Sequence, residues 1–216
     1  MSAGWFRRLI EVVLPTRCSV CQVVGAGVVC PQCLALLQPV GPYRCSRCGR
    51  CRTTPYASPD CGECHGRNIG VAAARSCLVY NAAGRQLLAD FKYSQRLGIG
   101  DELIRQMLEW LEPGLPALYG LPDIEAGIAV PVPLHRSRLL KRKFNQAEMI
   151  AERISAPLGL DCRPGLLYRV KDTKPQFGLS PQQRAENMQG AFAVPPGKKP
   201  RLKGRDVLLI DDLMTC

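Results

Sequence analysis

Four Cys-x-x-Cys pairs lie within the first 64 residues of this 216-residue chain and constrain its fold more than any other feature. The pairs are Cys18/Cys21, Cys30/Cys33, Cys45/Cys48 and Cys61/Cys64. A three-residue offset lets both thiolates of one tight turn reach the same ion, and two such turns supply the four sulfurs of a tetrahedral zinc site. Nine of the twelve cysteines fall between residues 18 and 64, and this clustering predicts metal binding rather than a disulfide scaffold.

Eight thiolates in four pairs predict two zinc ions. Short loop closures favour sequential pairing, with the first two pairs on one ion and the last two on the other. A cross-braced arrangement, in which the first pair shares an ion with the third, is the alternative. Closed four-thiolate sites leave no position for water, so the predicted role of zinc is structural rather than catalytic.

Several residues next to these pairs could take part in binding metal or nucleic acid. Cys51 and His65 could replace a ligand, although we expect both to be bystanders. Four arginines also lie between the second and fourth pairs: Arg44, Arg47, Arg50 and Arg52. They could touch nucleic acid, but a zinc ion bound by four thiolates carries negative charge that nearby arginines offset in any case.

The chain is strongly basic, with 29 Lys and Arg against 18 Asp and Glu, a formal net charge of +11. Such a balance points to anionic partners: phosphorylated metabolites, nucleic acid or acidic lipid. No apolar run reaches the roughly 20 residues that cross a bilayer. The opening segment lacks a small-residue cleavage site and predicts a short amphipathic helix around Trp5–Leu14. We therefore expect a soluble, cytoplasmic protein.

Cysteines thin out after residue 67, so we expect an N-terminal helix with a double zinc module over 1–67 and a second domain over 68–216. That domain alternates strand and helix patterns. The expected strands cover 71–80, 127–133 and 207–210. The expected helices cover 85–93, 101–112 and a segment capped by Asn145 that stops at Pro157.

The strand at 207–210 runs directly into Asp211 and Asp212. At the carboxyl end of a parallel strand, neighbouring carboxylates project into the crevice where ligands of open α/β sheets bind. Because two adjacent carboxylates repel each other, a partner such as a sugar diol or a metal is expected.

The order of motifs resembles the ComF family of competence-associated proteins, whose second domain is similar to a type I phosphoribosyltransferase. The motifs that carry the resemblance, besides the cysteine pairs, are Lys92-Tyr93, Pro131-Val-Pro-Leu-His135, Arg142-Lys-Phe-Asn-Gln146, Asp172-Thr-Lys-Pro-Gln176, Arg184-x-x-Asn187, Ala191-Phe192 and Ile210-Asp-Asp-Leu-Met-Thr215. The family usually has Arg-Gly where this chain has Arg142-Lys143, so the local backbone is expected to be less permissive.

The resemblance implies that 5-phosphoribosyl 1-pyrophosphate (PRPP) binds together with Mg²⁺. It implies that Asp211 and Asp212 accept hydrogen bonds from the ribose hydroxyls and that Thr215 begins the loop around the 5-phosphate. The turn from Pro131 to His135 corresponds to the pyrophosphate loop. The residues implied to contact the donor there are Pro133, His135, Arg142 and Lys143. The segment 172–187 resembles the mobile loop, from which Arg184 is expected to contact the diphosphate.

The implied reaction is displacement of pyrophosphate at the anomeric carbon, and the implied role is DNA uptake in natural competence. The alternative is a non-catalytic accessory protein that handles single-stranded DNA together with DNA-uptake proteins and uses the transferase fold as a scaffold. The family's phosphate loop continues beyond Thr215-Cys216 with Gly-x-Thr, a helix and a further strand. The resemblance therefore describes a C-terminally incomplete domain, and the 216-residue form is expected to bind PRPP weakly.

Overall fold

The computed structural model describes residues 15–55, 58–66, 70–93, 96–111, 127–176 and 178–214. The helix expected near Trp5 lies outside these ranges. The chain divides into two compact units, Met1–Pro122 with Met214–Cys216, and Asp123–Leu213. Each unit is described by itself, and the module boundary expected after residue 67 stays a prediction. No helix of the described ranges is long and apolar enough to cross a membrane.

The cysteine-rich part of the first unit has little regular secondary structure. Its one helix among the described residues is the short α2 (Pro31–Leu34), and its strand pairing is limited to isolated antiparallel bridges such as Arg17 with Val24 and Arg44 with Cys51. The cysteines themselves form the buried centre: the side chains of Cys18 and Cys45 are fully inaccessible to solvent. The loops of this region are therefore organised around sulfur atoms rather than around a sheet.

Residues 74–79 form backbone hydrogen bonds with loops of the cysteine-rich region instead of the strand expected over 71–80. The Ala74 N–H donates to the Arg47 carbonyl at 2.6 Å, and the Val40 N–H donates to the Cys77 carbonyl at 3.0 Å. Only a single bridge, between Pro39 and Leu78, has strand character. The expectation of a strand was wrong because these backbone groups are satisfied at scattered points of two loops rather than along one partner strand. We call residues 74–79 the strap.

Two helices follow the strap, α3 (Ala82–Tyr93) and α4 (Leu97–Leu111), and they contact each other. Asn81 caps α3, since its side-chain oxygen accepts from the Gly84 N–H at 2.9 Å. The buried side chains of the pair are Leu87, Phe91, Ile99, Leu103 and Ile104. Helix α4 begins at Leu97, before the expected residue 101, and its Gly100 lets the Phe91 ring pack directly against the helix backbone.

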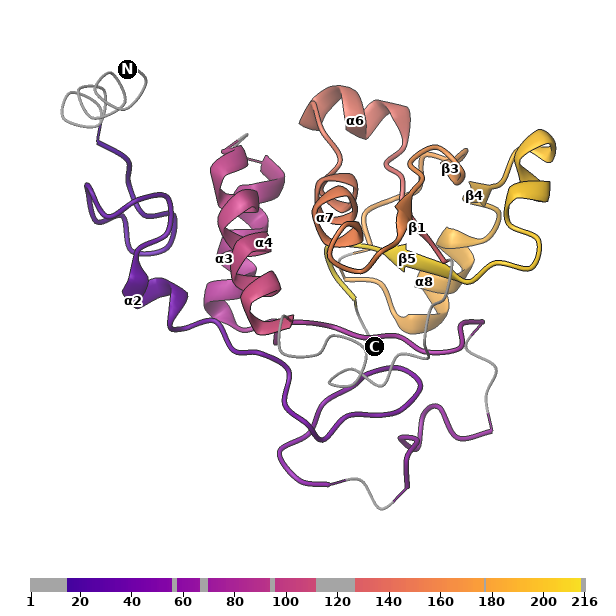
Figure 1. Cartoon of the computed structure of the whole chain (residues 1–216), viewed down its shortest axis with the longest axis horizontal. Coiled ribbons are helices and arrows are strands. Elements are labelled where there is room, and N and C mark those ends of the chain that lie inside the picture. Colours follow the sequence, from indigo (N-terminus) through magenta and orange to yellow (C-terminus); the bar gives the residue numbers. More distant parts are fainter. Residues whose placement is uncertain are drawn as a thin grey trace. The chain divides into compact units, whose positions relative to one another are not determined.

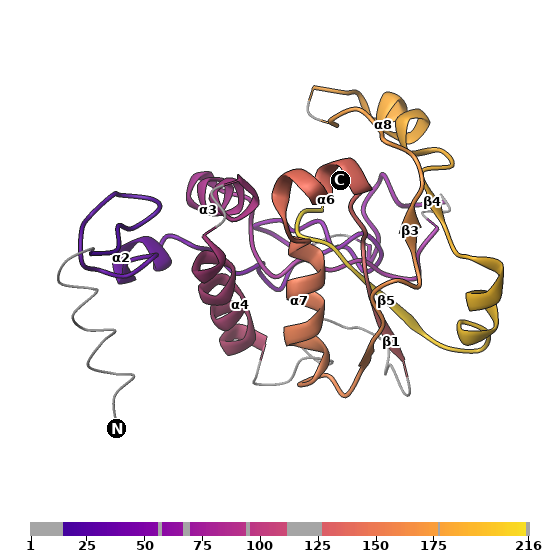
Figure 2. The same cartoon turned by 90° about the horizontal axis from the view of Figure 1, so that it is seen from above.

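The second unit contains a three-stranded parallel sheet in the order β2 (Asp161–Cys162), β1 (Ile128–Pro131) and β5 (Val207–Ile210) (Figure 1). Ile128 pairs with Val207 and Pro131 with Ile210. Helix α7 (Gln146–Ser155) runs beside the sheet and contacts all three strands (Figure 2). As expected, its N-cap is Asn145, whose side chain accepts from the Ala147 N–H at 3.2 Å. The expected α/β fold with a parallel sheet is confirmed.

The four apolar residues of β5, Val207 to Ile210, predict a strand that is among the most buried elements, and this prediction was wrong. Val207 and Leu209 are 43% and 50% exposed, whereas Ile210 is only 5% exposed. Successive side chains of a strand point to opposite faces, so Val207 and Leu209 share one face. On that face, Leu166 and Leu202 pack over the neighbouring residues of β1, and Val207 and Leu209 stay open to solvent.

The remaining elements surround the sheet. They are α6 (Arg136–Arg142), the antiparallel pair β3 (Tyr168–Arg169) and β4 (Phe192–Ala193), α8 (Pro181–Met188) and the 3-10 helix η1 (Pro196–Arg201). Segment 172–187 was expected as a poorly ordered loop, but it contains most of α8. A capping box explains this helix, because Ser180 and Gln183 each bond the other's backbone N–H.

The contact between Gly100 and Phe91 gives a direct stability test. A Cβ atom at residue 100 would lie 2.3 Å from the Phe91 ring, so we expect Gly100→Ala to lower the free energy of unfolding by about 1–3 kcal/mol. Gly98→Ala in the same helix is the matched control: its nearest neighbour is 3.4 Å away, and the change raises helix propensity. Urea unfolding measures both, and equal effects would contradict the packing.

Candidate functional site

Each of two groups of cysteines brings four sulfur atoms within 4.8 Å of one another. The first group is Cys18, Cys21, Cys30 and Cys33, and the second is Cys45, Cys48, Cys61 and Cys64. The grouping is the sequential one and not the cross-braced one. Sulfur atoms of Cys21 and Cys30 lie 3.6 Å apart, and those of Cys48 and Cys61 lie 3.7 Å apart. A tetrahedral ion with Zn–S bonds of about 2.3 Å separates its sulfurs by about 3.8 Å, so both groups could bind structural zinc.

The two groups are built alike. In each, the first cysteine accepts at sulfur from the backbone N–H of the third, at 3.4 Å for Cys18 and 3.2 Å for Cys45. The turn after each first pair passes through a left-handed residue, Gln22 at φ 63° and Gly49 at φ 70°. The sequence spacing indicated the pairs but not this shared backbone geometry.

The backbone donors change the acidity of the first thiol in each group. Burial raises the pKa of Cys18, but N–H donors from Cys21, Cys30 and Val20 outweigh burial and bring the pKa to about 6. Burial likewise raises the pKa of Cys45, and the donors around it again lower the pKa to about 6. Zinc binds the thiolate form of cysteine, so this arrangement suits a metal ligand.

The neighbours of the groups have other roles. Cys51 is exposed, and neither Cys51 nor His65 belongs to a four-cysteine group of the described residues. Arg50 forms a bidentate pair with Glu63 at 2.7 and 2.9 Å, and Arg47 donates to the Cys64 carbonyl at 3.0 Å. These two arginines therefore tie the loops of the second group together.

A second cluster lies where β1 and β5 end. The Val132 N–H donates to the Ile210 carbonyl at 2.8 Å, and the Asn145 side chain donates to the Val132 carbonyl at 3.1 Å. These bonds fix the turn after β1 beside the start of the Asp211-Asp212 pair. The Asp212 N–H donates to the Asp211 carboxylate at 2.8 Å, which orients that side chain.

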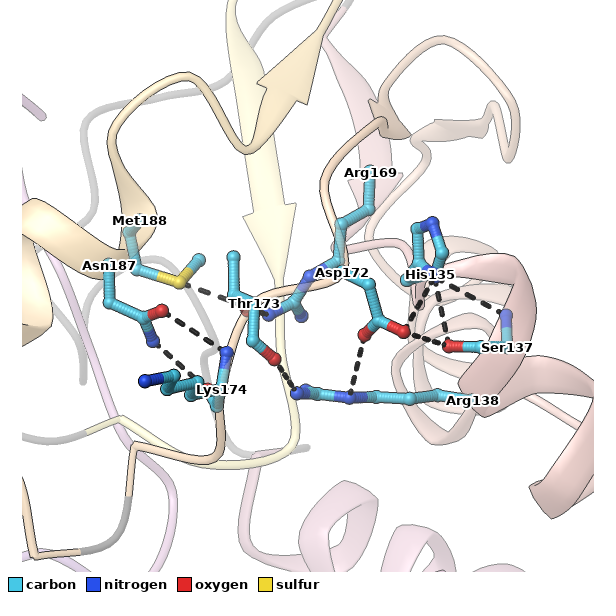
Figure 3. A network of polar contacts seen from close by, with 9 residues as sticks. All are labelled: His135, Ser137, Arg138, Arg169, Asp172, Thr173, Lys174, Asn187 and Met188. Carbon is cyan, nitrogen blue, oxygen red and sulfur yellow. Dashed lines mark hydrogen bonds and ion pairs between the residues drawn. The ribbon is translucent and has the colours of Figure 1, made fainter.

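His135 begins α6 and is joined through Ser137 to Asp172 (Figure 3). The His135 Nδ1 atom lies 2.9 Å from the Ser137 hydroxyl, which donates to the Asp172 carboxylate at 2.6 Å. The hydrogen bond from Ser137 lowers the pKa of Asp172, and the nearby charges of His135, Arg138 and Arg169 lower it further. Asp172 is therefore a stable anion at neutral pH.

The chain after Asp172 is held from both sides (Figure 3). From α6, Arg138 donates to the Thr173 carbonyl and lies 4.0 Å from the Asp172 carboxylate. From α8, Asn187 accepts from the Lys174 N–H at 3.2 Å and donates to the Lys174 carbonyl at 3.0 Å. Residues 172–174 thus form a clamp segment between the two helices.

Arg169 is a half-buried cation of this cluster. Its guanidinium donates to the Thr173 hydroxyl and lies 5.5 Å from the centre of the Phe192 ring, while its Nε atom is buried with no partner among the described residues. Burial lowers the pKa of Arg169, as do the charges of Arg138 and Arg142, whereas Asp211 and Asp172 raise it. Three arginines and two carboxylates therefore act on one another electrostatically.

The sequence-predicted residues divide into two sets. Pro133, His135, Arg142 and the Asp211-Asp212 pair lie on the two loops or on α6, and Arg142 donates to Gln146 at 3.3 Å. Arg184 lies in α8, and no contact joins it to the arginine cluster in the described residues; its Nε atom is buried without a partner. Thr215 lies outside the described residues. Lys143 caps the end of α6 at φ 71°, a left-handed conformation that glycine adopts more readily than lysine.

Sequence reasoning missed Arg169 and Ser137. Arg169 stands three residues before the Asp172 motif, at the end of a two-residue strand too short to show any alternating pattern. Ser137 lies between Arg136 and Arg138, and its bond to Asp172 spans 35 positions of the chain. A basic residue closely preceding an Asp-Thr motif was the only local signal.

We expect Ser137→Ala to raise the pKa of Asp172, because it removes the hydrogen bond that contributes most to lowering it. Carboxyl-carbon NMR across an acid titration measures this shift. Ser180→Ala is the control, since that hydroxyl caps α8 and does not contact Asp172. An Asp172 pKa that is the same in both variants would contradict the described network.

Several known proteins, named as competence or DNA utilization proteins, are similar to this chain. No family model matches the chain, and no solved structure matches it. Competence protein F of Haemophilus influenzae is 27% identical over 180 residues, 78% of each chain. DNA utilization protein YhgH of Escherichia coli K12 is 25% identical over 94% of this chain and 87% of its own length. Competence protein ComFC of Bacillus subtilis is 27% identical over 87% of this chain and 72% of its own length. Together with the cysteine groups and the parallel sheet, the similarity to these relatives supports an assignment of the chain to the ComF family.

Proposed function

We propose that this protein binds PRPP with Mg²⁺ at the carboxyl ends of β1 and β5, as a phosphoribosyltransferase-family protein, and acts in DNA uptake. The bond from the Val132 N–H to the Ile210 carbonyl, which brings the turn to His135 beside the start of the Asp211-Asp212 pair, carries the proposal. Arg138, Arg142 and Asp211 also act electrostatically on Arg169. A diphosphate carries several negative charges and offers paired oxygens that guanidinium groups bind in bidentate fashion.

The other end of the donor is proposed to bind the acidic pair. Carboxylates accept hydrogen bonds from vicinal hydroxyls, so Asp211 and Asp212 fit the ribose diol. Carboxylate, hydroxyl and phosphate oxygens are also the ligands that Mg²⁺ takes in proteins, so the donor set suits the ion. When bound, Mg²⁺ neutralises charge on the diphosphate that leaves the anomeric carbon.

His135 is suited to contact a phosphate oxygen of bound PRPP. The Ser137 N–H and hydroxyl groups lie 3.4 and 2.9 Å from its Nδ1 atom, so Ser137 holds the orientation of the ring. The other ring nitrogen, Nε2, is proposed to make the contact with a phosphate oxygen. Lys143, at the end of α6, and Arg184, in α8, are also proposed to contact PRPP.

The proposed biological role rests on the relatives. Two are named competence proteins and one a DNA utilization protein, and this chain spans 72–87% of their lengths. The four-cysteine groups are proposed to hold structural zinc. Single-stranded DNA handling through the arginines of the cysteine region is the alternative function. It is less favoured, because Arg47 and Arg50 are engaged with Cys64 and Glu63.

Neutralising the acidic pair tests the PRPP proposal. We expect Asp211→Asn with Asp212→Asn to weaken binding of PRPP with Mg²⁺ at least about tenfold, because charge-assisted bonds to the ribose hydroxyls contribute ~1.5–3 kcal/mol each. Binding of pyrophosphate alone should change little, whereas Arg142→Ala should weaken it. Isothermal titration measures all three.

Asp206→Asn is the matched control for that experiment, since Asp206 is exposed and precedes the same strand at its opposite end. It should leave the affinity for PRPP unchanged. If the Asp211 and Asp212 changes leave the affinity for PRPP unchanged, the proposal fails.

We also expect close to two zinc ions per chain. Cys18→Ser and Cys45→Ser should each release one ion, because the described groups share no ligand. Cys51→Ser should retain both ions, since Cys51 lies outside the groups. Metal analysis after anaerobic purification gives the counts. A protein without zinc, or loss of an ion in Cys51→Ser, would refute the assignment.

A further inference from the structure

Gln146, the first residue of α7, places a polar amide inside the Asp123–Leu213 unit. The residue is 1% exposed, and its Nε2 atom is buried without a hydrogen-bond partner among the residues that the structure describes. Such a nitrogen loses its hydration without gaining a hydrogen bond, which lowers stability. An apolar side chain of similar size would fill the same space without that cost. What the amide adds here is therefore its oxygen atom.

The amide oxygen of Gln146 accepts a hydrogen bond from Arg142. The distance from the Arg142 Nη1 atom to the Gln146 Oε1 atom is 3.3 Å. Arg142 is the last residue of α6 and is half-buried, whereas Gln146 lies in the interior. The bond therefore joins a guanidinium at the end of a helix to a group that the surrounding packing holds in place.

The start of α7 is itself fixed beside the proposed PRPP site. The Asn145 side chain donates to the Val132 carbonyl at 3.1 Å, which ties the start of α7 to the turn after β1. The same side chain accepts from the Ala147 N–H at 3.2 Å and caps the helix. Residues 143–145 are the whole link between α6 and α7, and Lys143 turns the chain there at φ 71°. Gln146 thus has little freedom to move relative to β1.

We propose that Gln146 is a positioning residue, which holds the Arg142 guanidinium in the orientation that binds the diphosphate of PRPP. The inference rests on the proposed function, in which Arg142 contacts the donor, and it assigns Gln146 no contact with the ligand. An arginine side chain has several rotatable bonds, and fixing them before the ligand arrives lowers the entropy cost of binding. A neutral amide does this while leaving the positive charge available to the phosphates.

Gln146→Met tests this role, because methionine is also long and unbranched but has no amide. We expect the variant to bind pyrophosphate with Mg²⁺ at least about threefold more weakly, since Arg142 is no longer held in one orientation. It should unfold at the same urea concentration as the wild type or at a higher one, because no unpaired amide nitrogen stays buried. Ser155→Ala is the control: it removes a buried hydroxyl at the other end of α7 and should leave the affinity unchanged.

The same substitution in the Arg142→Ala protein separates positioning from a general structural effect. Because Gln146 is proposed to act through Arg142, Gln146→Met should cause no further loss of pyrophosphate affinity once the guanidinium is absent. Isothermal titration of the wild type, the two single variants and the double variant measures this. An equal loss in both backgrounds, or no loss in the wild-type background, overturns the inference. Failure of the proposed function has a different signature: Arg142→Ala alone would then leave the affinity for pyrophosphate unchanged.

Discussion

The parallel pairing of β1 with β5 is the constraint on which the proposed PRPP site depends. Four residue pairs in register, extended by the bond from Val132 to Ile210, bring two strand ends together from positions about 80 residues apart in the chain. One end carries the turn to His135, and the other carries Asp211. Parallel strands cannot be joined by a tight hairpin, so the intervening chain has to return around the sheet. That return supplies α6, α7 and the arginine cluster.

The clamp segment shows how polar groups far apart in sequence organise one loop. Asp172, Thr173 and Lys174 are each held by a different partner: Ser137, Arg138 and Asn187. Two of these partners come from α6 and one from α8. The loop can leave the site only by breaking bonds on both sides, so movement of α8 and access to Arg169 are linked.

Local chemistry predicted some of this structure well. The cysteine spacing indicated both sulfur groups, the apolar run from 127 to 133 indicated a buried strand, and Asn145 indicated the start of α7. Features that depend on distant contacts were not predictable. Residues 71–80 have a strand-like composition but bind loops instead, and Arg169 acquires its character from Arg138, Arg142 and Asp211, which lie on other segments. The exposure of Val207 and Leu209 in β5 depends on which segments cover that face of the sheet. The sequence of β5 itself does not reveal this.

The strap connects the second cysteine group to α3 through the backbone. Ala74 bonds the backbone between Cys45 and Cys48, and a Cβ atom at Gly49 would lie only 2.4 Å from the Ala74 carbonyl oxygen, so the two segments fit closely. The strap then leads within three residues to α3. A change in the sulfur group therefore reaches the helices through the backbone, without any intervening side chain. Order in α3 is consequently coupled to the state of Cys45 and Cys48, and the two regions are expected to gain and lose structure together.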